Sequence, residues 1–516
     1  MKASRRALGL KNSTKAPCLA VFGTGSEVGK SIVVTALARC FVQDGIRVAP
    51  YKAQNMSNNS GVTPEGLEMG RAQLVQAEAA RIPPHVDMNP VLLKPTGETG
   101  SQLVLSGKAV ATLSARRYYR RKEALFRRVT AALNRLRRRY DGILIEGAGS
   151  CAEVNLMEHD IVNFTIAQAA DAPVILVADI HKGGVFGQIV GTLACLPLSH
   201  RDRIAGILIN RFRGDPRLFT EGAAWIEKKT RKRVLGVLPW HHGIRIDPED
   251  SVVLEHLNPA PKSTPGAARV AVVRIPHISN FTDFEPLFAV SGLEVVYIER
   301  AGNLSSFHAV ILPGSKNTRS DLDWLAAAGF KEALTSYVKN GGHVLGICGG
   351  YQMLGIRVHD EKGLEGPPGH TAGLAFLPVE TRLKAPKRTT RTRFSWNGAE
   401  GVGYEIHMGQ TRRKKETALF QILRRNDRPC KGEDGCATTD GRVLGTYIHG
   451  LFDTPAVTRQ WLDTLGLGHL SVPEDAGLMA RDRQYDLLAD HFRKHVDMDY
   501  LTSLFTKAKR STQTPK

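Results

Sequence analysis

The sequence lacks both a disulfide framework and a hydrophobic run that could cross a membrane. Its 516 residues include only 7 cysteines, an odd number scattered along the chain, which favours a reducing, cytoplasmic environment. The longest apolar runs, such as residues 172–178, are too short to span a bilayer, and no signal peptide opens the chain. Because 42% of the residues are hydrophobic and 23% are charged, disordered and fibrous classes are excluded too. We expect a soluble globular protein of at least two domains, with no membrane partner.

Acidic residues are scarce relative to basic ones. The chain has 50 Asp and Glu against 70 Lys and Arg, a net charge of +20. Such an excess admits three classes of partner, namely nucleic acid, an anionic membrane surface and small polyanionic substrates. Many of the cations fall in residues 116–139, where apolar residues recur at helical spacing and predict an amphipathic helix with a basic solvent face. Composition alone does not choose among these partners.

The order of apolar runs predicts two α/β domains. Short Val/Ile/Leu runs alternate with helical-period stretches in both halves of the chain, which is typical of doubly wound parallel sheets covered on both faces. Functional loops should then lie at the carboxyl ends of the strands. The runs expected to be strands are 19–22, 48–51, 142–145, 174–177, 204–209 and 234–238 in the first half and 270–273, 294–297, 309–312 and 343–347 in the second.

Composition shifts divide the chain further. The leader is basic and is expected to be disordered, with an organellar transit peptide as the alternative. The linker between the two domains is rich in proline and poor in apolar residues. The predicted divisions are a leader at 1–16, a P-loop ATPase domain at 17–254, a linker at 255–268, a second α/β domain at 269–470, and a helical extension with a basic tail at 471–516.

A glycine-rich loop predicts a phosphate-binding site in the first domain. The segment Gly-Thr-Gly-Ser-Glu-Val-Gly-Lys-Ser, with glycines at Gly23, Gly25 and Gly29, lies between a predicted strand and a predicted helix. Backbone N–H groups and the helix N-terminus would bind the phosphates of ATP, Lys30 would reach the outer phosphates, and Ser31 would ligate Mg²⁺. The loop is one residue longer than the usual spacing, as in dethiobiotin-synthetase-like ligases. The alternative is a glycine-rich turn with an incidental Gly-Lys-Ser.

Two carboxylates are candidates for binding Mg²⁺ beside this loop, because the metal prefers oxygen ligands. Glu146 ends a predicted strand and precedes Gly-Ala-Gly, so its carboxylate could reach the metal without crowding it. Glu68, in Gly-Leu-Glu-Met-Gly, is the second candidate. Either could instead be an ordinary solvated loop acid.

Polar residues follow three further strands of the first domain. Lys52 begins a segment that includes Asn55 and has enough amides and hydroxyls to bind a polar ligand, although Asn and Ser are also common in turns. Asp179 ends the fourth strand and Asn210 ends the fifth. We expect all of them on the face that carries the phosphate groups.

A strand, a tight turn and a helix around Cys348 predict a nucleophile elbow in the second domain. Flanking glycines permit the strained turn, the helix N-terminus favours the thiolate, and the N–H of Gly349 can stabilise an oxyanion. A second oxyanion donor is expected near Gly314 or Ser315, in the loop after another strand. The alternative for Cys348 is a buried structural cysteine.

The base expected to act with this cysteine is His449, about 100 residues later at the end of a short apolar run. His343 and His407 are less well placed, since the first begins the elbow strand and the second lies in a separate polar segment.

Taken in order, the motifs of both halves resemble the cobyric acid synthase family, the glutamine-dependent amidotransferases of cobalamin biosynthesis. The resemblance extends from about residue 18 to about residue 470. Single motifs occur elsewhere, but the ordered set is specific. Its members are 23–31, 54–60, 70–73, 76–78, 146–149, 183–186, 210–215, 280–284, 313–318, the Cys348 elbow, 403–407 and 447–450.

The resemblance implies a reaction and the roles of several residues. The family converts carboxylates b, d, e and g of adenosylcobyrinic acid a,c-diamide into amides, using ATP and glutamine, through an acyl phosphate that ammonia displaces. Cys348 and His449 would release that ammonia from glutamine. Lys52 would orient the substrate carboxylate, with Asn55 and Asp179 as further substrate contacts, and Asn210 would bind adenine.

Two positions depart from related glutaminases. Leu451 stands where a glutamate would complete a catalytic triad, so we predict a Cys–His dyad without a third member. His181 stands where an acid was expected, which leaves the role of Asp179 open. The sequence does not indicate an oligomeric state.

Two alternatives remain. One is a sibling amidotransferase, which makes the a,c-diamide or amidates a cell-wall lipid carboxylate. The other is a non-catalytic ATPase that binds nucleic acid or partitions on a membrane; the charge favours it, but it has no use for Cys348. The motifs favour ATP, Mg²⁺, glutamine and a corrinoid polycarboxylate, and no nucleic acid.

Overall fold

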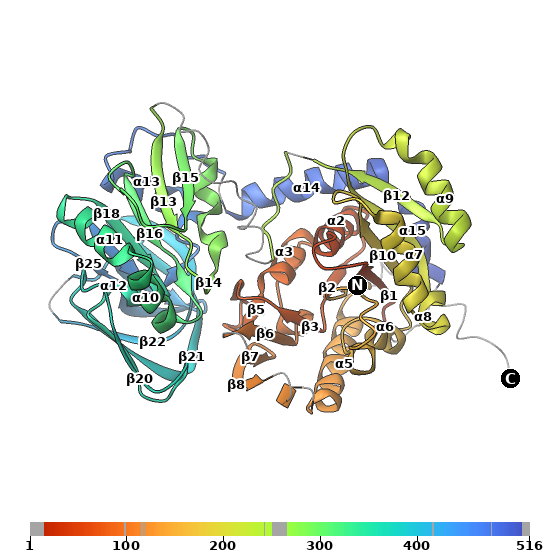
Figure 1. Cartoon of the computed structure of the whole chain (residues 1–516), viewed down its shortest axis with the longest axis horizontal. Helices are drawn as coiled ribbons and strands as arrows, with labels where there is room; N and C mark the ends of the chain where they lie inside the picture. The colour runs from red at the N-terminus through yellow and green to blue at the C-terminus, as the bar shows by residue number, and fades with distance from the viewer. Residues whose placement is uncertain are drawn as a thin grey trace.

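The protein is described from a computed structural model, whose described residues form two lobes joined by a C-terminal helix (Figure 1). The structure describes residues 15–96, 100–114, 117–118, 120–241, 243–249, 266–414, 417–475 and 477–507. The predicted leader (1–16), linker (255–268) and basic tail therefore lie almost entirely outside the described residues. Within those ranges, no helix is both long enough and apolar enough to pass through a membrane.

The N-terminal lobe is built on a parallel sheet of six strands in the order β12-β11-β10-β1-β9-β2. All six strands are among those predicted, and the central ones are buried along their whole length because helices cover both faces. The strands are β1 (Cys18–Gly23), β2 (Val48–Tyr51), β9 (Gly142–Glu146), β10 (Val174–Asp179), β11 (Ile204–Phe212) and β12 (Val234–Pro239). The helices are α2 (Lys30–Gln43), α3 (Arg71–Ala79), α5 (Lys122–Arg139), α6 (Phe164–Ala170), α7 (Val185–Cys195), α8 (Leu198–Arg203) and α9 (Thr220–Thr230).

A smaller mixed sheet, which the sequence did not predict, lies on the side of this lobe that faces the other (Figure 1). Its order is β3-β6-β7-β8, with β4 and β5 paired beside it. The strands are β3 (Gln54–Met56), β4 (Ser60–Val62), β5 (Glu68–Gly70), β6 (Val91–Pro95), β7 (Gly100–Leu105) and β8 (Lys108–Ser114). Because β4 packs against two strands of the C-terminal lobe, this sheet forms part of the boundary between the lobes.

The C-terminal lobe has a second parallel sheet in the order β15-β13-β16-β18-β26-β25, of which only the edge strand β25 is antiparallel. The strands are β13 (Ala268–Val273), β15 (Leu293–Ile298), β16 (Ala309–Leu312), β18 (His343–Ile347), β25 (Cys436–Ala437) and β26 (Val443–Thr446). The helices are α10 (Thr318–Ala327), α11 (Phe330–Lys339), α12 (Gly349–Leu354) and α13 (Pro455–Thr464). The prediction of α/β folding with parallel sheets is confirmed for both lobes.

A mostly antiparallel sheet is the main feature of this lobe that the sequence did not predict. The long hairpin of this sheet carries many cations at exposed positions, so its sequence pattern is that of a solvated, charged surface. The strands are β19 (Arg357–Asp360), β20 (Gly369–Ala372), β21 (Val379–Trp396), β22 (Ala399–Arg413), β23 (Phe420–Arg425), β24 (Arg428–Asp434) and β27 (Ile448–His449). A separate pair, β14 (Ile278–Ser279) and β17 (Gly314–Ser315), lies beside the parallel sheet.

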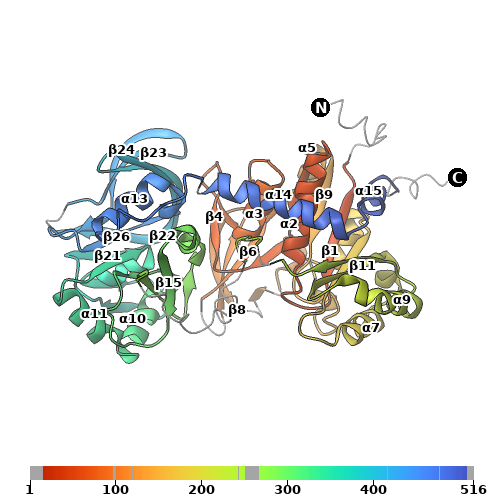
Figure 2. The same ribbon diagram turned by 90° about the horizontal axis from the view of Figure 1, so that it is seen from above.

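The C-terminal extension packs on the N-terminal lobe. Its helices are α14 (Leu478–His495) and α15 (Met498–Lys507), and α14 crosses α2 and α3 (Figures 1 and 2). Leu488 and Phe492 are buried in one hydrophobic cluster with α2. Arg481 binds Glu78 of α3 through its Nε (2.9 Å) and lies 3.4 Å from Asp453 of the C-terminal lobe. The end of the chain therefore fastens the two lobes together.

The basic stretch forms the amphipathic helix that its spacing predicts. In α5, Leu125, Val129 and Leu136 are buried against the sheet, while most of its arginines are exposed or half-buried. Arg135 pairs with Asp87. This arrangement places most of the local charge excess on the solvent side.

Candidate active sites

The glycine-rich loop joins β1 to α2, as predicted. Gly29 has φ 99°, in the left-handed region that favours glycine, and a Cβ there would lie 2.0 Å from Asn210 Nδ2. Lys30 folds back over the loop and donates to Gly25 O (2.8 Å) and Gly149 O (2.9 Å). Burial, with Lys52 nearby, lowers the pKa of Lys30 to about 8. The loop therefore brings backbone donors and a buried cation to the N-terminus of α2.

A cluster of oxygen ligands lies at the start of α2. Ser31 Oγ donates to Glu146 Oε1 (2.8 Å) and to Glu249 Oε2 (3.1 Å). Lys52 Nζ donates to both carboxylates, to Glu146 at 2.9 Å and to Glu249 at 2.7 Å. Gln76 Nε2 holds the second oxygen of Glu146. Although burial opposes its charge, Lys52 keeps the pKa of Glu249 below its ordinary value, which favours an ionised carboxylate beside the serine.

Glu249 is a residue that sequence reasoning missed. It follows the last strand of the parallel sheet by ten residues, in a segment with no regular structure, and only the return of that segment to α2 brings it to Ser31. The fifty acids of the chain offer no local signal that singles it out.

The predicted polar residues of this lobe occupy different positions. Asn55 lies in the cluster, where its side chain contacts Glu249 and donates to Gln73 Oε1 at 3.0 Å. Asn210 Nδ2 donates to Val28 O (2.8 Å) and so braces the phosphate loop. Asp179 is held by Arg211, whose Nη1 lies 2.8 Å from its Oδ2. These contacts place all three around the carboxyl ends of the parallel strands.

Glu68 lies elsewhere, because β5 carries it to the boundary between the lobes. Its Oε1 accepts from Lys94 Nζ (2.8 Å) and Ser60 Oγ (2.9 Å), and its Oε2 accepts from Lys387 Nζ (2.9 Å). Burial opposes its ionisation, but the two lysines hold its pKa well below the usual range. None of its recorded contacts is with Ser31 or Glu146, so we do not retain Glu68 as a metal ligand.

Cys348 lies in the strained turn that the motif predicts, between β18 and α12. Its φ of 53° and ψ of −105° are unusual for a residue with a side chain. The turn is possible because its neighbours are glycines: a Cβ at Gly350 would lie 2.0 Å from Leu312 O. The geometry presents the thiol at the N-terminus of α12, as a nucleophile elbow does.

Two backbone N–H donors flank the thiol. One belongs to Gly349, and of the two positions expected for the other, the structure favours Ser315 over Gly314. Lys316 N donates to His277 O (2.9 Å), so in this antiparallel ladder the N–H of Gly314 also faces β14 and that of Ser315 points the other way. A Cβ at Gly349 would lie 2.6 Å from Ser315 N. The geometry therefore favours Gly349 and Ser315, not Gly314, as the pair of oxyanion donors.

His449 contacts Cys348 and is held by an acid that the sequence did not reveal. The side chains of Cys348 and His449 line the same pocket; the thiol donates to Ile406 O (3.7 Å), and His449 Nδ1 lies 2.6 Å from Asp283 Oδ2. Asp283 Oδ1 also accepts from Gly450 N (2.9 Å). Burial opposes the protonated ring, but Asp283 and Cys348 outweigh it and raise the pKa of His449 to about 10. The expected dyad therefore has a third partner in the structure.

The signal for this partner was present in the segment 280–284, which belongs to the ordered motifs but had no role. Asp283 lies 166 positions before His449 and on a different element, whereas the glutamate of related triads would follow the histidine by two residues, at Leu451. His407, the competing histidine, is engaged by Gly409 O (2.8 Å) and Glu405 Oε2 (3.3 Å) and stacks on Tyr447.

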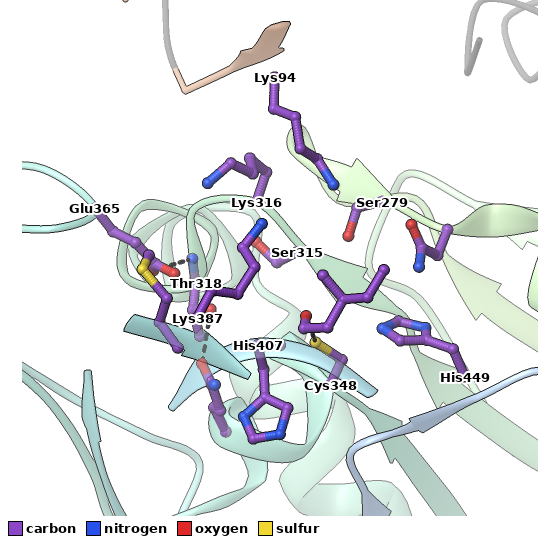
Figure 3. Close-up of a pocket in the computed structure, with 15 residues that line it drawn as sticks. Lys94, Ser279, Ser315, Lys316, Thr318, Cys348, Glu365, Lys387, His407 and His449 are labelled. Carbon is purple, nitrogen blue, oxygen red and sulfur yellow. Dashed lines mark hydrogen bonds between the residues drawn. The ribbon is translucent and has the colours of Figure 1, made fainter. Parts of the chain in front are cut away.

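A pocket opens over these groups and is lined by both lobes (Figure 3). Cys348 and His449 lie on one side of it, and Lys316, Lys387 and Glu365 lie on the other. Lys94, from β6 of the N-terminal lobe, completes the wall. The remaining lining residues are Ser279, Asn280, Ser315, Thr318, Gly349, Gln352, Ile406, His407 and Met408.

One polar segment of the N-terminal lobe connects this pocket with the cluster at Ser31. Ser57 Oγ donates to Glu249 O (2.8 Å), and Asn59 Nδ2 donates to Pro248 O (3.1 Å). Ser60 N donates to Asn280 Oδ1 (3.2 Å) at the pocket wall. The two candidate sites are therefore linked by a short run of hydrogen-bonded residues.

Comparisons with known proteins agree with this arrangement. The family model of the CobQ/CobB/MinD/ParA nucleotide binding domain matches residues 19–252, and that of the CobB/CobQ-like glutamine amidotransferase domain matches residues 269–457. The first range contains the glycine-rich loop, and the second contains Cys348, His449 and Asp283.

Curated relatives match the chain over almost its whole length. The cobyric acid synthase of Chlorobium phaeobacteroides (strain BS1) is 51% identical, covering 95% of this chain and 99% of the relative. The cobyric acid synthase of Chlorobaculum tepidum is 48% identical, covering 94% of this chain and 97% of the relative. That of Salmonella typhimurium is 45% identical, covering 93% of this chain and 97% of the relative. With both of its lobes matched, this chain belongs to the cobyric acid synthase family.

Proposed function

We propose that this protein amidates carboxylates b, d, e and g of adenosylcobyrinic acid a,c-diamide, using ATP and ammonia that it releases from glutamine. The observation that carries the proposal is the pairing of two sites in one chain: a Cys–His–Asp pocket, and a phosphate loop with the carboxylates of Glu146 and Glu249 beside it. Relatives that are 51% and 48% identical to this chain bear the name cobyric acid synthase.

In the N-terminal lobe we assign catalysis to positioning and charge stabilisation. The donor set of Ser31, Glu146 and Glu249 suits Mg²⁺, which prefers hydroxyl and carboxylate oxygens. These three residues would hold the metal, and the metal would neutralise part of the negative charge on the phosphates. Lys30 would turn from the loop carbonyls to the outer phosphates. Lys52 keeps the two carboxylates together and lies where it can also meet the carboxylate of the substrate.

Three assignments in this lobe remain predictions. We keep Asn210 as a contact for adenine, since its amide already touches the phosphate loop at Val28. Asn55 and Asp179 stay as substrate contacts at the same edge of the sheet. The substrate carboxylate would attack the γ-phosphate of ATP, and ammonia would then displace phosphate from the acyl phosphate.

In the C-terminal lobe we assign acyl transfer to Cys348. The thiolate attacks the amide carbon of glutamine, and the N–H groups of Gly349 and Ser315 stabilise the oxyanion. The proton on His449 passes to the departing ammonia, leaving a thioester that water hydrolyses to glutamate. Asp283 keeps the imidazole oriented and favours its protonated form. The seven cysteines are unpaired, which fits a reaction in the reducing cytoplasm.

Product mass after incubation with ATP, Mg²⁺ and glutamine tests the proposal. The a,c-diamide should gain four amides, and cobyrinic acid itself should not be amidated at carboxylates a and c. An unchanged a,c-diamide together with amidated a and c groups would instead identify the sibling that makes the diamide. Omission of glutamine and addition of ammonium salt should preserve the products.

A further inference from the structure

Five charged side chains gather at the pocket or in contact with its lining, and three of them are paired. Lys94 and Lys387 bind the two oxygens of Glu68, at 2.8 and 2.9 Å. Glu68 lies just behind the wall that these lysines form. Because the carboxylate of Glu68 binds both ammonium groups, these three side chains already have partners. They would act on a ligand mainly through their net positive charge.

Lys316 is different, because it is buried with Glu365 nearby but with no recorded hydrogen bond or ion pair of its ammonium group among the described residues. Its side chain is 7% exposed and lines the pocket. Among the residues that the structure describes, none accepts a hydrogen bond from its Nζ or forms an ion pair with it. A buried ammonium without a partner is costly. Burial and the neighbouring lysines lower the pKa of Lys316 to about 7, although Glu365 and Glu68 oppose this shift.

Glu365 lines the same side and is only partly satisfied. Its Oε2 accepts from Thr318 N (2.8 Å), and among the described residues its Oε1 has no recorded partner. Thr318 Oγ1 in turn donates to Gln352 Oε1 (3.0 Å), one turn of α12 after Cys348. The carboxylate is therefore fixed relative to the nucleophile through two hydrogen bonds.

We propose that Lys316 and Glu365 form the subsite for the α-carbon of glutamine, in which Lys316 binds the α-carboxylate and Glu365 binds the α-ammonium. The inference rests on the proposed function, since it concerns the substrate of the Cys348 pocket. Glutamine carries these two charges on one carbon, and two methylene groups separate that carbon from the amide. At the far side from the thiol, the pocket offers a lysine and a glutamate, and among the described residues Lys316 Nζ and Glu365 Oε1 have no recorded hydrogen-bond partner.

The loop from Gly314 to Thr318 then serves both ends of the substrate. Ser315 supplies the oxyanion N–H at the amide end, Lys316 follows it in the chain, and the N–H of Thr318 holds Glu365. One short segment therefore sets the distance between the amide carbon and the α-carbon. A substrate with the amide but without the charged groups would lose this second attachment.

Substrate analogues combined with two variants test the subsite. 4-Aminobutanamide lacks the α-carboxylate of glutamine, and glutaramate lacks its α-ammonium. Lys316→Met should raise the KM for glutamine roughly 10- to 100-fold, the loss expected of a charge-assisted hydrogen bond. The same variant should leave kcat/KM for 4-aminobutanamide unchanged. Glu365→Gln should show the opposite selectivity, losing activity on glutamine and 4-aminobutanamide but not on glutaramate.

Alkylation of Cys348 provides a readout that does not depend on turnover. 6-Diazo-5-oxonorleucine carries the α-amino acid end of glutamine, whereas iodoacetamide does not. In Lys316→Met the first reagent should react more slowly and the second at the wild-type rate. The matched control is Lys362→Met, an exposed lysine on the same surface segment as Glu365, which should change neither rate.

Two results would overturn the subsite. One is an unchanged KM for glutamine in Lys316→Met, and the other is an equal loss on glutamine and 4-aminobutanamide, which would indicate general damage to the pocket. A wild-type protein that releases no ammonia from glutamine would instead overturn the proposed function and the subsite with it. Ammonia-dependent amidation should stay at the wild-type rate in both variants.

Discussion

The two sites of this protein are assembled in different ways. The phosphate site is mostly local: the loop from Gly23 to Ser31 supplies its backbone donors, its cation and its hydroxyl in one stretch. The glutaminase pocket is mostly non-local, since Cys348, His449 and Asp283 come from three separate segments and Lys94 comes from the other lobe. Binding phosphate needs unpaired backbone N–H groups, which a single helix N-terminus provides. Activating a thiol needs partner side chains at defined distances, which only a folded sheet can bring together.

The sharpest way to separate the two sites is to remove the nucleophile. Cys348→Ser should lower glutamine-dependent amidation by roughly 1000-fold or more, since the hydroxyl is a far weaker nucleophile without a matched base. Ammonia-dependent amidation should remain. Assays of product formation with each nitrogen source would measure both. Loss of both activities would mean that Cys348 is a structural residue.

Removal of the phosphate-binding cation should produce the reverse pattern. Lys30→Met should reduce amidation with either nitrogen source by about 100-fold, because the transferred phosphoryl group loses its charge partner. Alkylation of Cys348 by iodoacetamide should continue at the wild-type rate. Retained amidation in this variant would contradict the assignment of the loop to ATP.

Substitution of Asp283, the acid that binds His449, tests how strongly the glutaminase pocket depends on a distant segment of the chain. Asp283 helps to raise the pKa of His449 to about 10, so Asp283→Asn should lower that pKa, and the protonated ring should be lost at a lower pH. Glutamine hydrolysis should fall roughly 10- to 100-fold, and its alkaline limb should move toward neutral pH. A titration of ¹⁵N-labelled histidine and a pH–rate profile would show both effects.

Asp453→Asn is the matched control for this change, because Asp453 lies on the same loop as His449 but faces Arg481. It should leave the pH profile of glutamine hydrolysis where it is. An Asp283→Asn protein with an unshifted profile would show that the carboxylate has only a structural role.

The smallest expected effect compares two acids that the sequence could not distinguish. Glu249→Gln should raise the Mg²⁺ concentration needed for half-maximal amidation by about 10-fold, because one of three oxygen ligands loses its charge. Glu68→Gln should leave that concentration unchanged, since Glu68 binds Lys94 and Lys387 instead. Mg²⁺ titrations of both variants would decide. A Mg²⁺ requirement that rises only in Glu68→Gln would restore the original assignment.

Local patterns predicted the framework well and the side-chain partners poorly. The ten apolar runs expected to be strands all lie within strands of the two parallel sheets, because buried parallel strands need continuous apolar residues. The antiparallel hairpin of β21 and β22 was not predicted, since the many arginines and lysines of its exposed faces obscure the alternation of apolar and polar residues that marks a strand. Similarly, the sequence left Gly314 and Ser315 as alternatives for the second oxyanion donor, because only the pairing with β14 shows which of the two N–H groups faces away from that strand.

The sequence by itself determined the loop at Gly23, the elbow at Cys348 and the presence of His449, because each depends on steric demands that neighbouring residues meet within a few positions. Only the tertiary structure decided that Asp283 supports His449, that Glu249 joins Ser31, and that Glu68 lies at the boundary between the lobes. It also brought Lys316 and Glu365 to the same side of the pocket at Cys348. These outcomes depend on where charged side chains are buried and paired. Pairing brings together residues that are hundreds of positions apart, such as Lys387 and Glu68 at a separation of 319, and local sequence cannot specify such a contact.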